Sequence, residues 1–221
     1  PCQAADMAPF YAALPFALTA AQRRAIADAV GDMTSGRPMN RLCQGDVGSG
    51  KTMVAAAAAY CAARNGAQTA LMAPTEILAE QHFASLSALF VPLGVSVALL
   101  TGSMAGKQKK DVRERIAAGE VQVVIGTHAL LSESTRFDNL GLVITDEQHR
   151  FGVGQRSRLS AKGEDPHLLV MSATPIPRTL ALILYGDLDV SVISELPPGR
   201  QPVETFLVSE ALRERLNVFI R

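Results

Sequence analysis

Eight consecutive residues have the types and spacing of a phosphate-binding loop. The segment 45–52 reads GDVGSGKT and fits the pattern G-x-x-x-x-G-K-[ST]. Glycines let successive backbone N–H groups wrap around a phosphate, which the positive end of the following helix also faces. The lysine would reach the β- and γ-phosphates, and the threonine hydroxyl would hold Mg²⁺. The sequence thus predicts a nucleotide site made by Gly45, Asp46, Val47, Gly48, Ser49, Gly50, Lys51 and Thr52.

The surroundings of this loop fit the motif too. An apolar strand is predicted over 41–44 and an alanine-rich helix over 51–65, as a phosphate loop requires. The bare pattern arises by chance about once in a hundred chains of this length. With a strand before it and a helix after it, a glycine-rich turn without function is a poor explanation.

Two adjacent acids could complete the nucleotide site. Asp146 and Glu147 follow the apolar run 142–145, so they are expected at the carboxyl edge of a sheet. There Asp146 could bind the metal, and Glu147 could face the attacking water as a general base. Such a pair on its own would more often be a solvated loop, and the phosphate loop reverses that preference.

Composition narrows the class of protein. The chain has 221 residues, 48% of them hydrophobic, which is enough for one sizeable core. Lys+Arg and Asp+Glu both number 21, so any nucleic-acid site must be local. Aromatic residues are 5% and Trp is absent, which argues against base recognition mainly by stacking. The three cysteines are too sparse for a disulfide framework or a zinc site and indicate reduced thiols.

Apolar runs alternate with helix-like stretches along the chain. Strands are predicted at 41–44, 69–73, 96–100, 121–126, 142–145, 168–171 and 190–193, and helices at about 19–33, 51–65, 75–90, 105–118 and 175–184. Nearly wholly apolar strands between helices are typical of a parallel sheet covered on both faces. The predicted fold class is therefore α/β with a mainly parallel sheet. Pro-Pro-Gly at 197–199 favours a linker, followed by a strand at 203–208 and a helix at 209–221.

Six motifs in order along the chain carry a family resemblance. They are GDVGSGKT (45–52), APTEILA (73–79), TGS (101–103), GTH (126–128), DEQH (146–149) and SAT (172–174). Together they resemble the first motor domain of superfamily 2 helicases. Finer details resemble the RecG family of branched-DNA translocases more than its Mfd- and PriA-like relatives, notably LPF (14–16), HRFGV (149–153), TPIPRTLAL (174–182) and PPGRQPV (197–203).

This resemblance implies a RecA-like P-loop fold and an enzyme that hydrolyses ATP, with Mg²⁺, to move on branched or duplex DNA. Residues 1–196 would form the ATP-binding motor domain, 197–202 a linker, and 203–221 the start of a second motor domain. The resemblance also implies a wedge domain and an arginine finger on the second motor domain, which do not fit in this sequence. Since the chain opens with Pro1 and has no signal peptide or membrane span, we expect a cytoplasmic fragment that is nearly inactive alone.

Further residues gain roles from the resemblance. Gln22 is placed like the adenine-reading glutamine of related motors, with Phe16 near the ring, although a surface glutamine and a core phenylalanine are equally good interpretations. Gln148 and His149 look like the link that senses γ-phosphate, whereas a lone histidine is more often structural. The catalytic set is then Lys51, Asp146, Glu147, Gln148 and His149.

The DNA contacts implied by the resemblance lie in loops or helix starts after successive strands. Hydroxyls and free N–H groups there can bind a DNA backbone without reading bases, although each could equally be a helix cap. These residues are Thr75, Gln81, Thr101, Gly102, Thr127 and His128, and Ser172 and Thr174 would bridge the acid loop to the DNA side.

Two groups of basic residues are further candidates for DNA contact. The first lies on the predicted helix 105–118 and is interleaved with acids, which favours a solvated face over a DNA patch. It comprises Lys107, Lys109, Lys110, Arg113 and Arg115. The second group, in a stretch that RecG-like chains carry near their duplex-gripping elements, comprises Arg150, Arg156, Arg158 and Arg178.

Other functions remain open at this stage. A nucleotide-dependent switch or phosphotransferase would need only the phosphate loop, but the DEQH and SAT motifs fit it poorly. A non-catalytic DNA-binding module with a degenerate loop ranks last, because no motif residue is degenerate.

Overall fold

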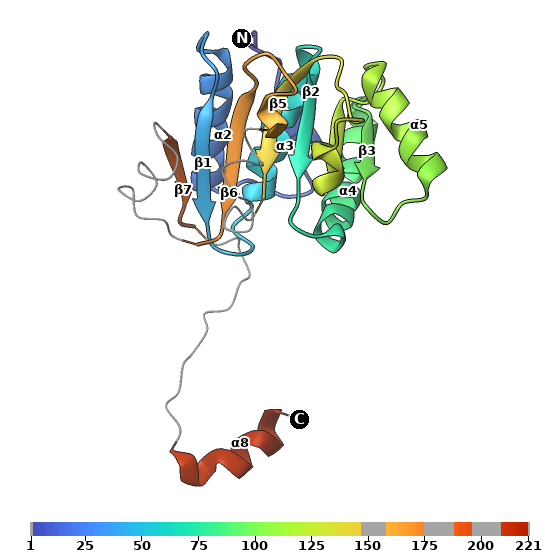
Figure 1. The fold of residues 1–221 in the computed structure, drawn as a ribbon. Coiled ribbons are helices and arrows are strands. Elements are labelled where there is room, and N and C mark those ends of the chain that lie inside the picture. Colours follow the sequence, from blue (N-terminus) through green and yellow to red (C-terminus); the bar gives the residue numbers. More distant parts are fainter. Residues whose placement is uncertain (1, 147–157, 175–187, 196–208, 221) are drawn as a thin grey trace.

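The computed structural model describes residues 2–146, 158–174, 188–195 and 209–220. Within them, seven strands form one sheet in the order β3-β4-β2-β5-β6-β1-β7, and every neighbouring pair is parallel. The strands are β1 Asn40–Gly45, β2 Gln68–Met72, β3 Val97–Leu100, β4 Val123–Gly126, β5 Leu140–Thr145, β6 His167–Ser172 and β7 Asp189–Ile193. Because all strands run the same way, their carboxyl ends meet at one edge (Figure 1).

Helices connect these strands. The α-helices are α1 Ala8–Ala13, α2 Ala20–Thr34, α3 Lys51–Arg64, α4 Glu76–Phe90, α5 Gly106–Ala117 and α8 Arg213–Ile220. Short 3₁₀ segments are η1 Val91–Leu93, η2 His128–Leu131 and η4 Glu210–Leu212. Among the described helices, none combines the length and the apolar character that crossing a bilayer would take.

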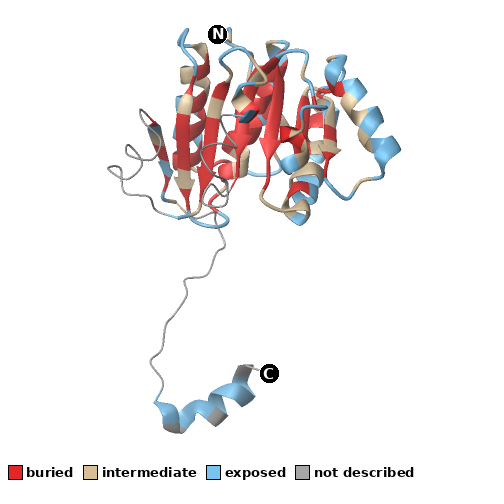
Figure 2. Cartoon of the chain, in the orientation of Figure 1, coloured by how far each residue is buried: buried red, intermediate tan, exposed pale blue. Residues whose placement is uncertain are grey.

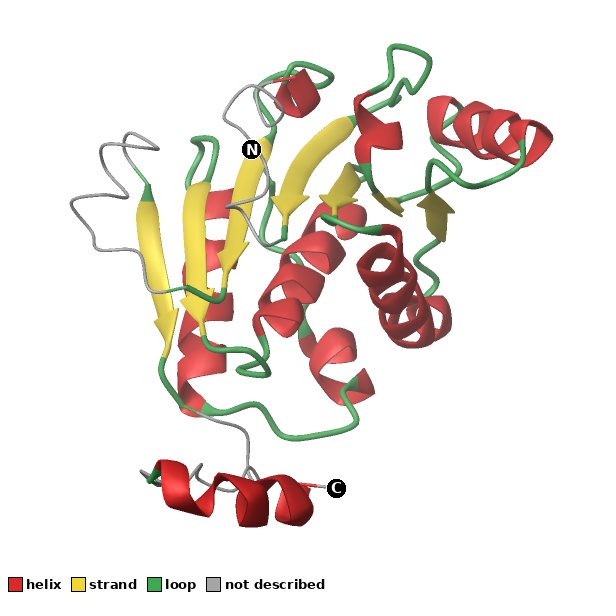
Figure 3. Cartoon of the chain, turned by 60° about the horizontal axis from the view of Figure 1, so that its bottom comes forward, coloured by secondary structure: helices red, strands yellow, loops and turns green. Residues whose placement is uncertain are grey.

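The sheet separates two hydrophobic layers, as the buried strands in Figure 2 and the helices beside them in Figure 3 illustrate. On one face, α2, α3 and α4 pack on alternate strand residues such as Leu71 and Ile144. On the other face, α5 and η2 pack on the intervening residues, such as Met72 and Val143. Burial on both faces explains why the strands are almost wholly apolar. The predicted α/β class is confirmed.

Local sequence signals account for where α2, α3 and α4 begin. Thr19 and Gln22 form a reciprocal capping box at the start of α2. Thr75 caps α4 by accepting a hydrogen bond from the Leu78 N–H. The helix α3 follows Gly50, and its alanines are buried between α2 and the sheet because small side chains allow close packing.

All seven predicted strands of the sheet are confirmed within one or two residues at most ends. The short helix α1 was not predicted, because its six residues bury only Phe10 and show no helical period. The helix predicted at 209–221 is present as η4 and α8. The predicted helix 175–184 and strand 203–208 lie outside the described residues.

Candidate nucleotide-binding and nucleic-acid site

The phosphate loop joins the end of β1 to the start of α3, as its motif predicts. Gly48 and Gly50 adopt the left-handed backbone conformation, with φ of 79° and 91°, which side chains disfavour. At Gly45 an added Cβ would lie 2.5 Å from the Ser49 Oγ and 3.0 Å from the Ile193 carbonyl. The glycines of the motif are therefore required by the shape of the loop.

Lys51 points back into this loop from the first turn of α3. Its Nζ donates to the carbonyl oxygens of Gly45 at 2.6 Å and Asp46 at 3.0 Å, and the residue is buried. The Ser49 hydroxyl is buried and has no hydrogen-bond partner within the described part of the chain. A full positive charge and an unsatisfied donor in the loop suit a phosphate group.

Gln22 contacts the same loop from α2. Its Oε1 accepts from the Thr19 N–H at 2.9 Å, and its Nε2 donates to the Ser49 carbonyl at 2.8 Å. The residue is 3% exposed, so the alternative interpretation as a surface glutamine is wrong. Phe16 is 51% exposed, which excludes a core role for it. The adenine contacts predicted for both residues stay predictions.

Asp146 follows the last residue of β5 at the carboxyl edge of the sheet. Residues 142 and 144 of this strand face α3 and α4, so the alternation of the strand turns Asp146 to the same side. Its N–H donates to the Met72 carbonyl at 3.0 Å, and its Oδ2 lies 2.7 Å from the Nε2 of His82 on α4. The carboxylate therefore lies on the side of the sheet that carries the phosphate-loop helix.

The donor set at this edge fits Mg²⁺. The Thr52 hydroxyl and the Asp146 carboxylate are both oxygen donors, which this ion prefers. In the described ranges no three His, Cys, Asp or Glu side chains come together as a metal cage. Mg²⁺ characteristically uses one or two carboxylates together with substrate phosphates. Thr52 and Asp146 would hold the ion, which supplies charge neutralisation on the phosphates when bound.

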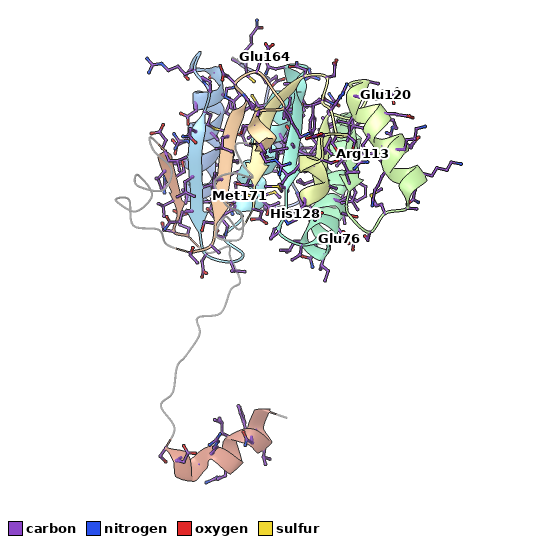
Figure 4. The ribbon with its side chains drawn as sticks, viewed as in Figure 1. Glu76, Arg113, Glu120, His128, Glu164 and Met171 are labelled. Carbon is purple, nitrogen blue, oxygen red and sulfur yellow. The ribbon has the colours of Figure 1, made fainter. Side chains whose placement is uncertain are left out.

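A hollow separate from the phosphate loop lies at the carboxyl ends of β2, β3 and β4. Its volume is about 520 Å³, and residues from several of the predicted DNA-binding motifs line it together. Thr75, Gly102, Thr127 and His128 are joined there by Lys109 and Arg113 of α5. Glu76 also lines it, and its carboxylate accepts the Ser103 N–H at 2.9 Å. Hydrogen bonds from Ser103 lower the pKa of Glu76 below its usual range. Figure 4 labels Glu76, Arg113 and His128 in this part of the molecule.

The basic group on α5 divides into two sets. Lys110 pairs with Glu114 and Arg115 with Glu120, and these four side chains are at least 45% exposed, as expected of a solvated face. Lys109 and Arg113, one helical turn apart, instead face the hollow. Lys109 donates to the Gly102 carbonyl, and the Arg113 Nε donates to Thr135 Oγ1 at 3.2 Å. Lys109 and Arg113 are half-buried, whereas Lys107, Lys110 and Arg115 are exposed, so the interpretation as a solvated face describes the latter three best.

The other predicted DNA contacts differ in accessibility. Gln81 is exposed on α4, whereas Thr101 is 1% exposed and shares a hydrogen bond with Ser103. Ser172 and Thr174 bond to each other, with 3.1 Å between their hydroxyl oxygens. Arg158 is exposed. Further predicted site residues lie outside the described part of the chain, namely Glu147, Gln148, His149, Arg150, Arg156 and Arg178.

Two features of the site were missed in the sequence. His82 was not predicted as a site residue, although its four-residue spacing from Leu78 and Leu86 puts it on the inward face of α4. The grouping of Lys109 with Arg113 could have been found from their own four-residue spacing, which separates them from Lys110 and Arg115.

Comparisons with known proteins show the family of this chain. The family model for DEAD/DEAH box helicases matches residues 19–183. The chain is similar to the ATP-dependent DNA helicase RecG of Bacillus subtilis (strain 168), at 56% identity over 211 residues that cover 96% of this chain and 31% of that protein. RecG of Haemophilus influenzae is 55% identical over 211 residues, covering 94% and 30%. The chain thus spans about a third of the length of these curated relatives.

Solved structures of helicases share the fold of this chain. A structure of RecG bound to a three-way DNA junction matches with a TM-score of 0.84 and 48% identity, over 96% of this chain and 28% of that one. A DEAD box protein from Methanococcus jannaschii shares the fold, with a TM-score of 0.57 at 21% identity, over 81% of this chain and 55% of that one. The chain has the RecA-like motor fold of these proteins and belongs to the DEAD/DEAH box helicase family.

Proposed function

We propose that this chain is the ATP-binding motor domain of a RecG-like DNA helicase, which hydrolyses ATP to remodel branched DNA such as stalled forks and Holliday junctions. The observation that carries the proposal is a single sheet edge with two sites. Lys51 and Asp146 would flank the proposed nucleotide site, and a hollow with two basic side chains lies farther along the same edge. The similarity to RecG, including a structure bound to a DNA junction, supports the choice of DNA.

ATP with Mg²⁺ is the proposed cofactor. Lys51 and the backbone N–H groups of the phosphate loop would bind the phosphates, and Thr52 and Asp146 would hold the metal. Glu147 would act as the general base, and Gln148 and His149 would sense the γ-phosphate. Ser172 and Thr174 would connect this machinery to the DNA.

The DNA would bind along the hollow by its backbone. Lys109 and Arg113 provide positive charge, while Thr75, Gly102, Thr127 and His128 provide donors on three successive loops. Contacts of this type position a nucleic acid without reading its bases. They also suit a chain whose net charge is zero, because the positive charge is concentrated at one place.

We further propose that residues 1–196 form this motor domain, 197–202 a linker and 203–221 the start of a second motor domain. The longer protein would add the rest of that domain and a wedge domain, because the RecG relatives are about three times as long as this chain. Its place of action would be the cytoplasm.

The proposal is tested by ATP hydrolysis in the full-length protein with and without DNA. Branched DNA should stimulate turnover more than a linear duplex of the same composition. Lys51→Ala is the matched control, because it removes the full positive charge of the loop and should abolish ATP binding in calorimetry. Turnover that no DNA stimulates would contradict the assignment as a translocase.

A further inference from the structure

The contact between His82 and Asp146 stands out among the histidine contacts of the described residues. The Nε2 of His82 lies 2.7 Å from the Oδ2 of Asp146, and the two side chains are 11% and 12% exposed. By contrast, His167 has an ordinary structural role, since its Nδ1 accepts the backbone N–H of Met39. His82 is thus directed at a carboxylate that the nucleotide site would use for its metal.

The fold brings these residues together across 64 positions of sequence. His82 lies on the face of α4 that packs on the sheet, between Leu78 and Leu86. Asp146 continues the alternation of Leu142 and Ile144, which face the same layer. The contact therefore joins the buried side of a helix to the end of the central strand β5.

The hydrogen bond from His82 sets the orientation of the Asp146 carboxylate. An ionised carboxylate only accepts hydrogen bonds, so the Nε2 of His82 carries the hydrogen and donates it. The Asp146 backbone is held as well, because its N–H donates to the Met72 carbonyl at 3.0 Å. The bond engages one carboxylate oxygen, Oδ2, and in the proposed site the other oxygen would bind the metal or its water shell. Partners of this kind set the orientation of a metal-binding carboxylate.

We propose that His82 is a positioning residue for the metal-binding carboxylate of Asp146, an inference that rests on the proposed nucleotide site. His82 does not touch nucleotide or metal in this role. The same helix is capped at its amino end by Thr75, which lines the hollow proposed for DNA. One rigid helix therefore contacts the hollow at its amino end and the metal-binding carboxylate seven residues further on.

The experiment measures the Mg²⁺ requirement of nucleotide binding in the full-length protein. Binding of fluorescent ADP is followed by anisotropy during a Mg²⁺ titration, for wild type, His82→Met and His82→Gln. Loss of the donor in His82→Met should raise the half-saturating Mg²⁺ concentration about 10-fold or more, the usual effect of removing such a partner. His82→Gln should restore most of the wild-type requirement, because the glutamine Nε2 can donate from nearly the same place. Affinity without Mg²⁺ should be unchanged in all three.

Further variants keep the test decisive if His82→Met does not fold. His82→Asn is polar but too short to reach Oδ2, so it should behave like the methionine variant rather than the glutamine variant. An unchanged Mg²⁺ requirement in His82→Asn or His82→Met would overturn the positioning role. If wild type itself bound nucleotide without any Mg²⁺ dependence, the proposed metal site would be wrong, which is a separate outcome.

Discussion

The side-chain amide of Gln22 donates to the carbonyl of Ser49 at 2.8 Å and so ties the first turn of α2 to the phosphate loop. The other end of the same amide closes the capping box with Thr19. At Gly50 an added Cβ would overlap the Gln22 side chain. The start of α2 and the shape of the loop therefore depend on one another.

Replacing Gln22 by alanine should destabilise both the start of α2 and the phosphate loop. A buried carbonyl that loses its donor costs about 1–3 kcal/mol, which corresponds to roughly 5- to 150-fold in nucleotide affinity if the loop loosens. Calorimetry should therefore show weaker binding of both ATP and inorganic tripolyphosphate. Gln22→Glu tests the bond to Ser49 separately from the capping box, because glutamate can still accept from the Thr19 N–H but has no N–H to donate to the Ser49 carbonyl. A loss confined to ATP would instead make Gln22 a reader of adenine only.

Glu147→Gln should separate ATP binding from hydrolysis. The substitution keeps the size of the side chain but removes the proposed general base, so hydrolysis should slow by ~100-fold or more. Calorimetry should still show ATP and Mg²⁺ binding, because Lys51, Thr52 and Asp146 are unchanged. A near-normal rate in single-turnover measurements would assign the base to another residue.

Lys109→Ala and Arg113→Ala should each weaken DNA binding, and to a similar extent for different sequences. Each removes one phosphate contact, so the slope of log affinity against log salt should fall by about 1. Lys110→Ala is the matched control on the same helix, because Lys110 is exposed and paired with Glu114. Fluorescence anisotropy over a salt series provides the measurement. Equal slopes for all three variants would exclude the hollow as the DNA site.

Sequence patterns were sufficient to predict the strands of the sheet and the phosphate loop. The strands were predicted because burial on both faces makes them continuously apolar, and the phosphate loop because its glycines meet local backbone demands at Gly48 and Gly50. These signals are local in the chain. Strand order and the sharing of one sheet edge follow from long-range packing, which no local pattern contains.

Contacts between distant residues explain what the sequence did not yield. His82 meets Asp146 only because α4 packs on the face of the sheet toward which β5 turns Leu142 and Ile144. In the sequence, Lys109 and Arg113 do not differ from the other residues of a mixed-charge helix. In the folded chain, they line a hollow together with residues of the loops after β2 and β4. Their role depends on what faces the helix, whereas the sequence shows only the spacing along it.

Cys2 should be the most reactive thiol of the chain. A hydrogen bond from Cys61 and the proximity of His167 hold the pKa of Cys2 below its usual range, and burial raises the pKa of Cys43 to about 12. Since the thiolate is the reactive form, alkylation of Cys2 should persist as the pH falls from 8.5 to 7, while Cys43 stays protonated. Mass spectrometry after brief iodoacetamide treatment checks the order. Faster labelling of Cys43 than of Cys2 would contradict it.

Hydrolysis of ATP by the 221 residues alone should be very slow. Removing an arginine finger from a site of this kind costs 10³–10⁵ in rate, because charge that develops on the transferred phosphoryl group then faces water instead of guanidinium. If the finger is on a second motor domain, this chain should bind ATP weakly, hydrolyse it scarcely above background and unwind no DNA.

Fusion to the proposed second motor domain tests that expectation directly. Fusing the carboxyl-terminal motor domain back onto the chain should restore DNA-stimulated turnover, and the same fusion with Lys51→Ala should stay inactive because it cannot bind ATP. The comparison separates a missing partner from a defective nucleotide site, since only the partner differs between the chain and the fusion. Robust DNA-stimulated hydrolysis by the 221 residues alone would mean that every group needed to stabilise the transition state lies within this chain.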